Sequence, residues 1–236
     1  MFLRYTETGY LIILPQDNLH WIVDAMLDTG YREEFCISLD FTPEFIARLM
    51  EAGFLVMSTK IGRQEDINDN IQYILLPKLH LSRSALFFEN LHIKKSIRRH
   101  LHNYDLRFDV DFDRIVERCL DVHGDEWLTS PLIKAIRDIR QNRFYGVYPT
   151  SFALYRKGEL VAGEFGVQVG KVYTSYSGYY DESNAGTVQL VLAARYLQEN
   201  DFTFFDLGMP LDYKNDLGAI DISPQEFVKL FRAYKS

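Results

Sequence analysis

The stretch that indicates the fold is SFALYRKGELVAGEFGVQVGKVYTSYS, residues 151–177. It contains three segments rich in Val, Phe, Tyr and Leu, at 151–156, 160–169 and 172–177, and this composition favours strands. Lys157-Gly158-Glu159 and Gly170-Lys171 separate the segments, and short glycine-containing connections are typical of hairpins. A loop over 178–184 then leads into a helix over about 185–199 and a buried strand over 202–207. We therefore predict a central, mostly antiparallel sheet with a helix before its last strand.

The first third of the chain is predicted to form a smaller unit. Apolar segments at 10–14 and 34–39 indicate strands, and Thr42-Pro43 is a favourable helix start because Thr caps and Pro suits the first helical position. The run KIGRQEDINDN, residues 60–70, is the most polar in the chain, and we expect a linker or mobile loop there. The prediction is a small N-terminal α+β domain over 1–65 and a larger domain over 66–236, with an overall α+β (α/β) fold class.

Composition and charge exclude several classes of protein. Apolar residues make up 47% and charged residues 25% of the 236 residues, as in an ordinary globular protein. The formal net charge of −7 argues against a surface coated with basic residues, although a local basic cluster can still bind phosphates. Cys36 and Cys119 are far apart and have no companion histidines, so we expect no metal site, no disulfide and a cytoplasmic location. No segment has the length of a membrane span, so we expect no membrane association.

Several short motifs carry a resemblance to a known family. They are Leu91–Ser96, Glu126-Trp127-Leu128, Leu160–Val167 (LVAGEFGV), Ser175–Tyr180 (SYSGYY) followed by Asn184–Thr187 (NAGT), Phe205–Gly208 (FDLG) and Asp216–Ala219 (DLGA). By these motifs the chain resembles the leucyl/phenylalanyl-tRNA–protein transferases, whose catalytic domain is GNAT-like. The predicted order of three antiparallel strands, a helix and a strand is also that of GNAT-type acyltransferases. The resemblance thus implies a GNAT-like acyltransferase domain.

The resemblance also implies an activity. Enzymes of this family take a leucyl or phenylalanyl group from a tRNA ester and join it to the N-terminal Arg or Lys of a protein. The reaction is aminolysis of an activated ester, so positioning the amine can supply much of the acceleration, with effective molarities of up to about 10⁵–10⁸ M. The partners implied are aminoacyl-tRNA and an acceptor protein with a basic N-terminal residue. We expect no cofactor and a monomer.

The resemblance assigns roles to particular residues. Asp206, at the end of a predicted strand, takes the place of the carboxylate that orients the incoming amine and accepts its proton. The residues implied in substrate binding are Trp127, Glu164, Tyr176, Ser177, Asn184 and Tyr213. Bland alternatives stay open: Asp206 as a strand-end group that caps a turn, Trp127 as a core residue, and Ser177 and Asn184 as turn and cap residues.

Several family residues are replaced at these positions. The partner Gln after the catalytic Asp is Gly208, the loop Glu and Met are Tyr176 and Gly178, the His is Tyr213, and Met57 ends the segment that replaces Phe-Pro-Trp. Glu164 stands where the family has an apolar residue. A charged, unpaired glutamate in a pocket for Leu or Phe would cost several kcal/mol, so we hypothesise a different amino-acid specificity.

A basic run is the strongest electrostatic feature of the sequence. It comprises Lys94, Lys95, Arg98 and Arg99, with His100 and His102 behind them, on a predicted helix over 94–102. Lys95, Arg98, Arg99 and His102 would share one helical face. Such a cluster in an acidic chain suits the phosphates of a tRNA acceptor arm, whereas the alternative is a solvated helix face. Arg83 is a further candidate for tRNA contact, because it aligns with a family Arg.

Two other functions compete with transfer from tRNA. One is a relative that binds tRNA or an N-terminal peptide without turnover, as the replaced residues allow. The other is a GNAT-type N-acyltransferase with another acyl donor such as acetyl-CoA. That function calls for a glycine-rich, pyrophosphate-binding loop at the start of the helix, and Ser183–Thr187 (SNAGT) lacks this pattern.

Overall fold

The computed structural model describes residues 2–61 and 72–235. Its residues fall into two compact units, one made of 1–81 and 124–147 and the other of 82–123 and 148–236. The predicted linker over 60–70 lies outside the described residues, except for Lys60 and Ile61. The predicted division into domains over 1–65 and 66–236 stays a prediction.

Among its described residues, the first unit has two small sheets and three main helices. Strands β1 (Arg4–Tyr5), β2 (Leu11–Ile12) and β3 (Cys36–Ile37) form one sheet, and β4 (Leu55–Ile61) pairs antiparallel with β5 (Gln72–Lys78). The helices are α1 (Leu19–Thr29), α2 (Pro43–Glu51) and α5 (Ser130–Asn142), followed by the 3₁₀ turn η3 (Phe144–Gly146). Helix α2 packs against α5 and β4. Pro43 lies at the start of α2, as predicted, whereas the Thr42 side chain forms no cap hydrogen bond.

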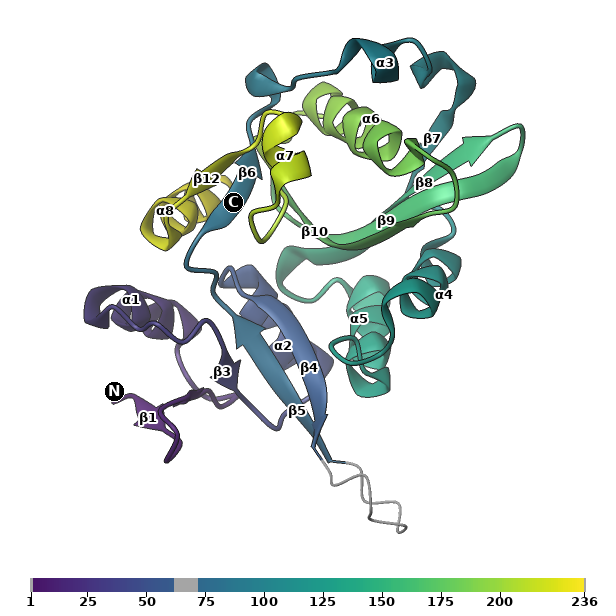
Figure 1. The fold of residues 1–236 in the computed structure, drawn as a ribbon. Helices are drawn as coiled ribbons and strands as arrows, with labels where there is room; N and C mark the ends of the chain where they lie inside the picture. The colour runs from purple at the N-terminus through teal and green to yellow at the C-terminus, as the bar shows by residue number, and fades with distance from the viewer. Residues whose placement is uncertain (1, 62–71, 236) are drawn as a thin grey trace. The chain divides into compact units, whose positions relative to one another are not determined.

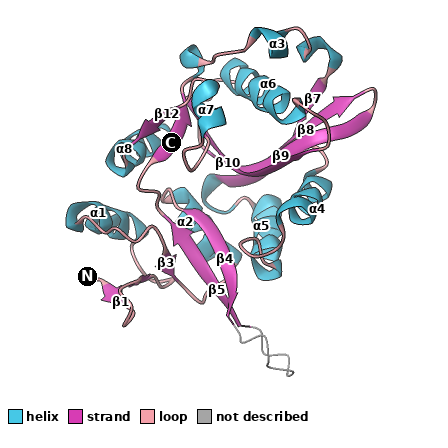
Figure 2. Cartoon of the chain, in the orientation of Figure 1, coloured by secondary structure: helices cyan, strands magenta, loops and turns pink. Residues whose placement is uncertain are grey.

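The second unit is built on a seven-stranded sheet (Figures 1 and 2). Its order is β12 (Ile220–Ile222), β6 (Arg83–Leu86), β11 (Phe204–Asp206), β10 (Val172–Tyr180), β9 (Glu159–Val169), β8 (Val147–Arg156) and β7 (Asp105–Phe108). Strands β10 and β11 run parallel, whereas the pairs β12–β6, β6–β11, β10–β9 and β8–β7 run antiparallel. The predicted mostly antiparallel sheet and the α+β class are therefore confirmed.

Helices cover both faces of this sheet. Helix α6 (Ala185–Glu199) packs on one face, where its residues join a core that includes Tyr173 and Phe205. Helix α4 (Phe112–His123) lies on the opposite side of β8–β10 (Figure 1) and brings Phe112 against Phe165. Helix α8 (Pro224–Tyr234) brings Phe227 against Phe204. Because neighbouring strand residues point to opposite faces, β11 presents Phe205 to α6 and its neighbours Phe204 and Asp206 away from it.

The basic run is less helical than predicted. The α-helix there, α3, covers only Lys95–Arg98, and the 3₁₀ turn η2 (Leu101–Asn103) follows it. The remaining short elements are η1 (Phe88–Asn90) and α7 (Asp212–Asp216). No side chain caps the start of α3, and cations in a first turn oppose the helix dipole, which explains why the helix is short. The single helical face predicted for Lys95, Arg98, Arg99 and His102 is therefore wrong.

Candidate functional site

Asp206 ends β11 inside the second unit and is bound on all sides. Its side chain is 0% exposed and that of Arg83, on the neighbouring β6, is 2% exposed. Arg83 Nε donates to Oδ1 at 2.9 Å and Nη2 donates to Oδ2 at 2.5 Å. Thr174 Oγ1 on β10 donates to Oδ2 at 2.8 Å, and the Gly208 amide donates to Oδ1 at 3.0 Å. The carboxylate thus ties together three strands and the turn after β11.

This geometry favours a structural anion. Burial would raise the pKa of Asp206, but the Arg83 charge and the hydrogen bonds from Arg83, Thr174 and Gly208 outweigh it and lower the pKa. Two carboxylate oxygens offer about four acceptor sites, and four donors use them. Accepting a further proton would require breaking one of these bonds. The catalytic role of Asp206 stays a prediction, for which the described conformation offers no open acceptor site.

Arg83 lies in the interior, away from the surface on which a tRNA phosphate would bind. Its guanidinium carbon lies 3.8 Å from the centre of the Phe227 ring, while its nitrogens bind Asp206. The bidentate fork of Arg suits this carboxylate. In the described conformation Arg83 therefore holds β11 in place, and its contact with tRNA stays a prediction.

Glu164, on β9, is a second buried carboxylate. It is 2% exposed and lies directly across from Gly178 of β10 in the strand register. Ser175 Oγ donates to its Oε2 at 3.2 Å, and Oε1 has no hydrogen-bond partner among the described residues. Burial raises the pKa of Glu164 to about 7, although Ser175, Gln189 and Tyr173 counteract the shift. At neutral pH this group is therefore poised between its charged and neutral forms.

Lys214 and Tyr213, on α7, lie within electrostatic reach of Glu164. Lys214 Nζ donates to the carbonyls of Leu207 at 2.5 Å and Met209 at 2.7 Å, which fixes the turn that follows Asp206. Burial lowers the pKa of Lys214 to about 8, against the opposing influence of Asp206 and Glu164. Burial and the charge of Glu164 both raise the pKa of the half-exposed Tyr213. The structure thus brings together two of the predicted substrate-binding residues, Glu164 and Tyr213.

The other predicted substrate-binding residues lie apart from that group. Tyr176, beside a bulge in β10, has its ring 6.1 Å from that of Phe165 on the α4 side. Ser177 is partly exposed and faces Cys119 of α4, to which it hydrogen-bonds. Asn184 is exposed before α6 with a φ of 68°, and its side chain forms no cap. Asn184 occupies the N-cap position of α6 without a side-chain cap bond, and its left-handed backbone fits the turn role that was the alternative.

Trp127 belongs to the first unit. Its carbonyl accepts a bond of 2.9 Å from the Ser58 amide, and the residue is partly exposed, so both the binding role and the core alternative stay open. Met57 lies in the same unit, on β4 across from Leu76. A site that Trp127 or Met57 shares with Asp206 or Glu164 therefore stays a prediction.

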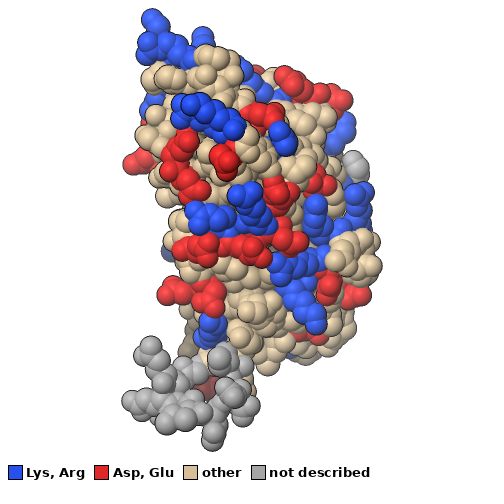
Figure 3. Space-filling model, turned by 90° about the vertical axis from the view of Figure 1, so that its right-hand side faces the viewer, with Lys and Arg blue, Asp and Glu red and all other residues tan. Residues whose placement is uncertain are grey.

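The basic segment, defined as Lys94, Lys95, Arg98 and Arg99, is exposed along its whole length. Lys94 Nζ forms an ion pair of 2.6 Å with the exposed Asp216. Within residues 2–61 and 72–235, no ion pair joins Lys95, Arg98 or Arg99 to an acid. Figure 3 shows Lys and Arg side chains gathered at the top of one face, with mixed charges below. Lys95, Arg98 and Arg99 are therefore available to a polyanion.

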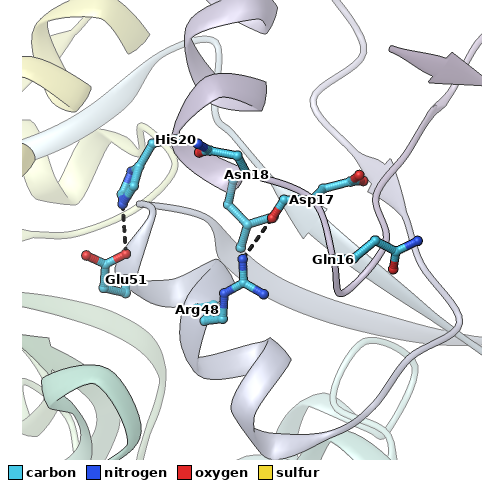
Figure 4. A pocket seen from close by; sticks show the side chains of 7 residues that line it. Gln16, Asp17, Asn18, His20, Arg48 and Glu51 are labelled. Carbon is cyan, nitrogen blue, oxygen red and sulfur yellow. Dashed lines mark hydrogen bonds and ion pairs between the residues drawn. The ribbon is translucent and has the colours of Figure 1, made fainter. Parts of the chain in front are cut away.

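A hollow of about 320 Å³ lies in the first unit, near the start of α1 (Figure 4). It is lined by Gln16, Asp17, Asn18, Leu19, His20, Arg48 and Glu51. Its charged groups are engaged: the Asp17 carboxylate binds Arg4, Arg48 donates to the Asp17 carbonyl, and His20 contacts Glu51 at 3.0 Å. These bonds serve to join α1 to α2.

No group of three or more His, Cys, Asp or Glu side chains in the described parts of the chain could hold a metal ion. No helix found there has the length and apolar character needed to cross a bilayer.

Three residues near Glu164 escaped the sequence analysis. Tyr173 and Lys214 resemble ordinary core and surface residues in the sequence. Gln189 did offer a signal, because it is a polar residue next to Val188, on the part of α6 that is buried. A buried amide needs partners, so its presence there indicated a polar neighbour.

The chain is similar in sequence to proteins of one family. The sequence model described as leucyl/phenylalanyl-tRNA protein transferase matches residues 85–232. Two relatives with that name, from Pseudomonas entomophila (strain L48) and Hahella chejuensis (strain KCTC 2396), are 31% identical over 150 residues and 30% identical over 153 residues. These alignments cover 61% and 63% of this chain, and they span only 65% and 64% of the relatives' lengths. A third, from Campylobacter jejuni subsp. doylei (strain ATCC BAA-1458 / RM4099 / 269.97), is 25% identical over 81% of this chain and 85% of its own.

Proposed function

Because the chain belongs to the leucyl/phenylalanyl-tRNA protein transferase family, we propose that it transfers an aminoacyl group from tRNA to the N-terminal amine of a protein. The observation that carries this proposal is the extent of the family match. Residues 85–232 include all of β7–β12 and the buried carboxylates Glu164 and Asp206. The proposed partners are an aminoacyl-tRNA and an acceptor protein with a basic N-terminal residue. We propose that the protein acts as a monomer in the cytoplasm.

The proposed reaction makes limited demands on the protein. The acceptor amine attacks the ester carbonyl, an amide bond forms, the ester C–O bond breaks, and the tRNA ribose oxygen leaves with a proton that the amine gives up. Positioning of the two substrates can supply a large part of the acceleration. Asp206 supports this positioning because it ties β6, β10 and β11 together, and Lys214 supports it because it holds the turn after β11.

We propose that the basic segment contacts the tRNA. Lys95, Arg98 and Arg99 are exposed cations in a chain whose formal net charge is −7, so the segment is a local attraction for phosphates. Each phosphate contact displaces counterions, which makes such binding salt-dependent.

The test is transfer of label from a mixed pool of charged, labelled tRNAs to an acceptor protein with N-terminal Arg or Lys. The same acceptor with an acetylated N-terminus is the matched control, since it has no free α-amine. Label in the free-amine acceptor alone supports the proposal. No label with any aminoacyl group, from protein whose folding is verified by circular dichroism, refutes it.

The closed environment of Asp206 favours a second candidate function, a family member that binds tRNA or an N-terminal peptide without transfer. All four acceptor positions of the carboxylate are occupied. Binding of charged tRNA with a salt-dependent affinity, together with an absence of label in the acceptor, would identify this function.

A further inference from the structure

Three polar atoms in the second unit are buried and have no hydrogen-bond partner within the described part of the chain. They are Glu164 Oε1 on β9, Tyr173 Oη on β10 and Gln189 Nε2 on α6. The three residues are 2%, 0% and 3% exposed. We call them the Glu164 cluster. Most buried polar atoms in native proteins are bonded, so three without partners in one region require an explanation.

The three side chains belong together. Gln189 and Tyr173 lower the pKa of Glu164 as side-chain hydrogen-bonding groups, and burial together with Glu164 raises the pKa of Tyr173. The three groups therefore lie next to one another, although no contact between these atoms reaches the geometry of a full hydrogen bond. Gly166 lets the phenol reach across β9, because a Cβ at that position would lie 2.7 Å from Tyr173 Oη. The hydroxyl therefore lies over β9 two residues from Glu164, on the same face of the strand.

The cluster lies immediately below residues that solvent reaches. Gly178, directly across from Glu164, is exposed, and Ser175, which donates to Glu164, is partly exposed. A side chain at 178 would bring a Cβ to 3.1 Å from the Glu164 Cβ. Glycine at this position therefore places no side chain against Glu164.

The chemistry of the three atoms defines what would complete them. Glu164 Oε1 accepts a hydrogen bond, Gln189 Nε2 donates, and Tyr173 Oη does both. A hydrocarbon group placed there would leave all of them unbonded, at about 1–3 kcal/mol for each buried group. A group that donates to Glu164 would remove the largest of these costs, because a charged acceptor forms the stronger bond.

We infer that the Glu164 cluster receives the side chain of the transferred amino acid, and that this side chain ends in a hydrogen-bond donor. The inference rests on the proposed function and specifies its substrate class. Lysyl and arginyl groups bring a donor with a positive charge, whereas glutaminyl and asparaginyl groups bring a neutral one. Leucyl and phenylalanyl groups bring none.

The experiment is competition between tRNAs charged with these amino acids, using wild type, Glu164→Gln, Glu164→Leu and Tyr173→Phe. Glu159→Gln is the matched control, since Glu159 is an exposed glutamate on the same strand. Wild type and the control are expected to transfer donor-bearing groups at least about tenfold faster than Leu or Phe, a modest ratio for a site built to hydrogen-bond its substrate. Glu164→Leu is expected to reverse this ranking.

The arms of the experiment separate the possible outcomes. If Glu164→Gln loses lysyl and arginyl transfer but keeps glutaminyl transfer, the donor is charged. If wild type prefers glutaminyl and asparaginyl groups to lysyl and arginyl groups, the donor is neutral. Transfer of Leu or Phe at equal or higher rates by wild type overturns the inference while leaving the proposed function intact, and leaves water as the partner of the cluster. An absence of transfer by every variant overturns the proposed function itself.

Discussion

Asp206→Asn is expected to destabilise the second unit strongly, because it places an amide donor against the Arg83 guanidinium. The two groups are 0% and 2% exposed, and Nη2 lies 2.5 Å from Oδ2. Breaking one partner of a buried ion pair leaves an uncompensated charge and costs about 3–5 kcal/mol. This is a large share of the about 5–15 kcal/mol that stabilises a typical domain. Replacing both partners, with Arg83→Met and Asp206→Asn together, is expected to cost less than the two single changes added.

The assay must report on the second unit. Both tryptophans, Trp21 and Trp127, lie in the first unit, so their fluorescence follows that unit. Urea unfolding is therefore followed by far-UV circular dichroism, and hydrogen exchange of β9–β11 amides is measured in parallel. Asp221→Asn serves as the control, because Asp221 is an exposed aspartate on β12 of the same sheet. Its free energy of unfolding should stay within about 0.5 kcal/mol of wild type.

A cost below about 1 kcal/mol for Asp206→Asn, typical of an exposed pair, would contradict the buried pair. So would strict additivity in the double variant, since residues in contact are expected to couple. The pH dependence gives an independent check. The folded pKa of Asp206 is lowered, so its contribution to stability is present above the unfolded value of about 3.8 and is lost as the pH falls through the folded pKa. Loss of transfer in an Asp206 variant therefore diagnoses catalysis only where folding is intact.

Three further predictions follow from the same geometry. The folded pKa of Glu164 is raised to about 7, so the native state keeps its proton longer than the unfolded chain, and stability should fall by about 3 kcal/mol as the pH rises from about 4.5 to about 7. Urea unfolding at pH 5 and pH 8 should show this loss in wild type and in Glu159→Gln but not in Glu164→Gln, and an equal slope in all three would contradict it. Tyr173→Phe removes a buried hydroxyl that has no partner in the described residues. The free energy of unfolding of this variant should therefore lie between that of wild type and a value about 1 kcal/mol higher. A loss of more than about 1 kcal/mol would show that the hydroxyl is bonded. Replacing Lys95, Arg98 and Arg99 with Ala should weaken tRNA binding and reduce the slope of log K against log salt by about 2–3. Replacing the exposed turn lysines Lys157 and Lys171 with Ala should leave this slope unchanged.

Local patterns predicted much of the second unit. The strands over 151–156, 160–169 and 172–177 and the helix over 185–199 correspond to β8, β9, β10 and α6. These elements follow from turn residues and apolar runs that lie close together in sequence. The prediction of a helix over 94–102 was wrong. Ile97 and Leu101 are buried and fit the helical period, but the start of the helix lacks a cap.

The composition and motifs of the sequence by themselves determined the α+β class, the family and the presence of carboxylates at 164 and 206. Only the tertiary structure decided what each carboxylate does. Arg83 and Asp206 are 123 residues apart in sequence and meet across β6 and β11, while Glu164 meets Tyr173 and Gln189 from three different elements. The state of a buried acid depends on the donors and charges that surround it, and no local pattern records which distant segments supply them. Hence two similar residues in the sequence become a saturated structural anion and an incompletely bonded cluster in the folded chain.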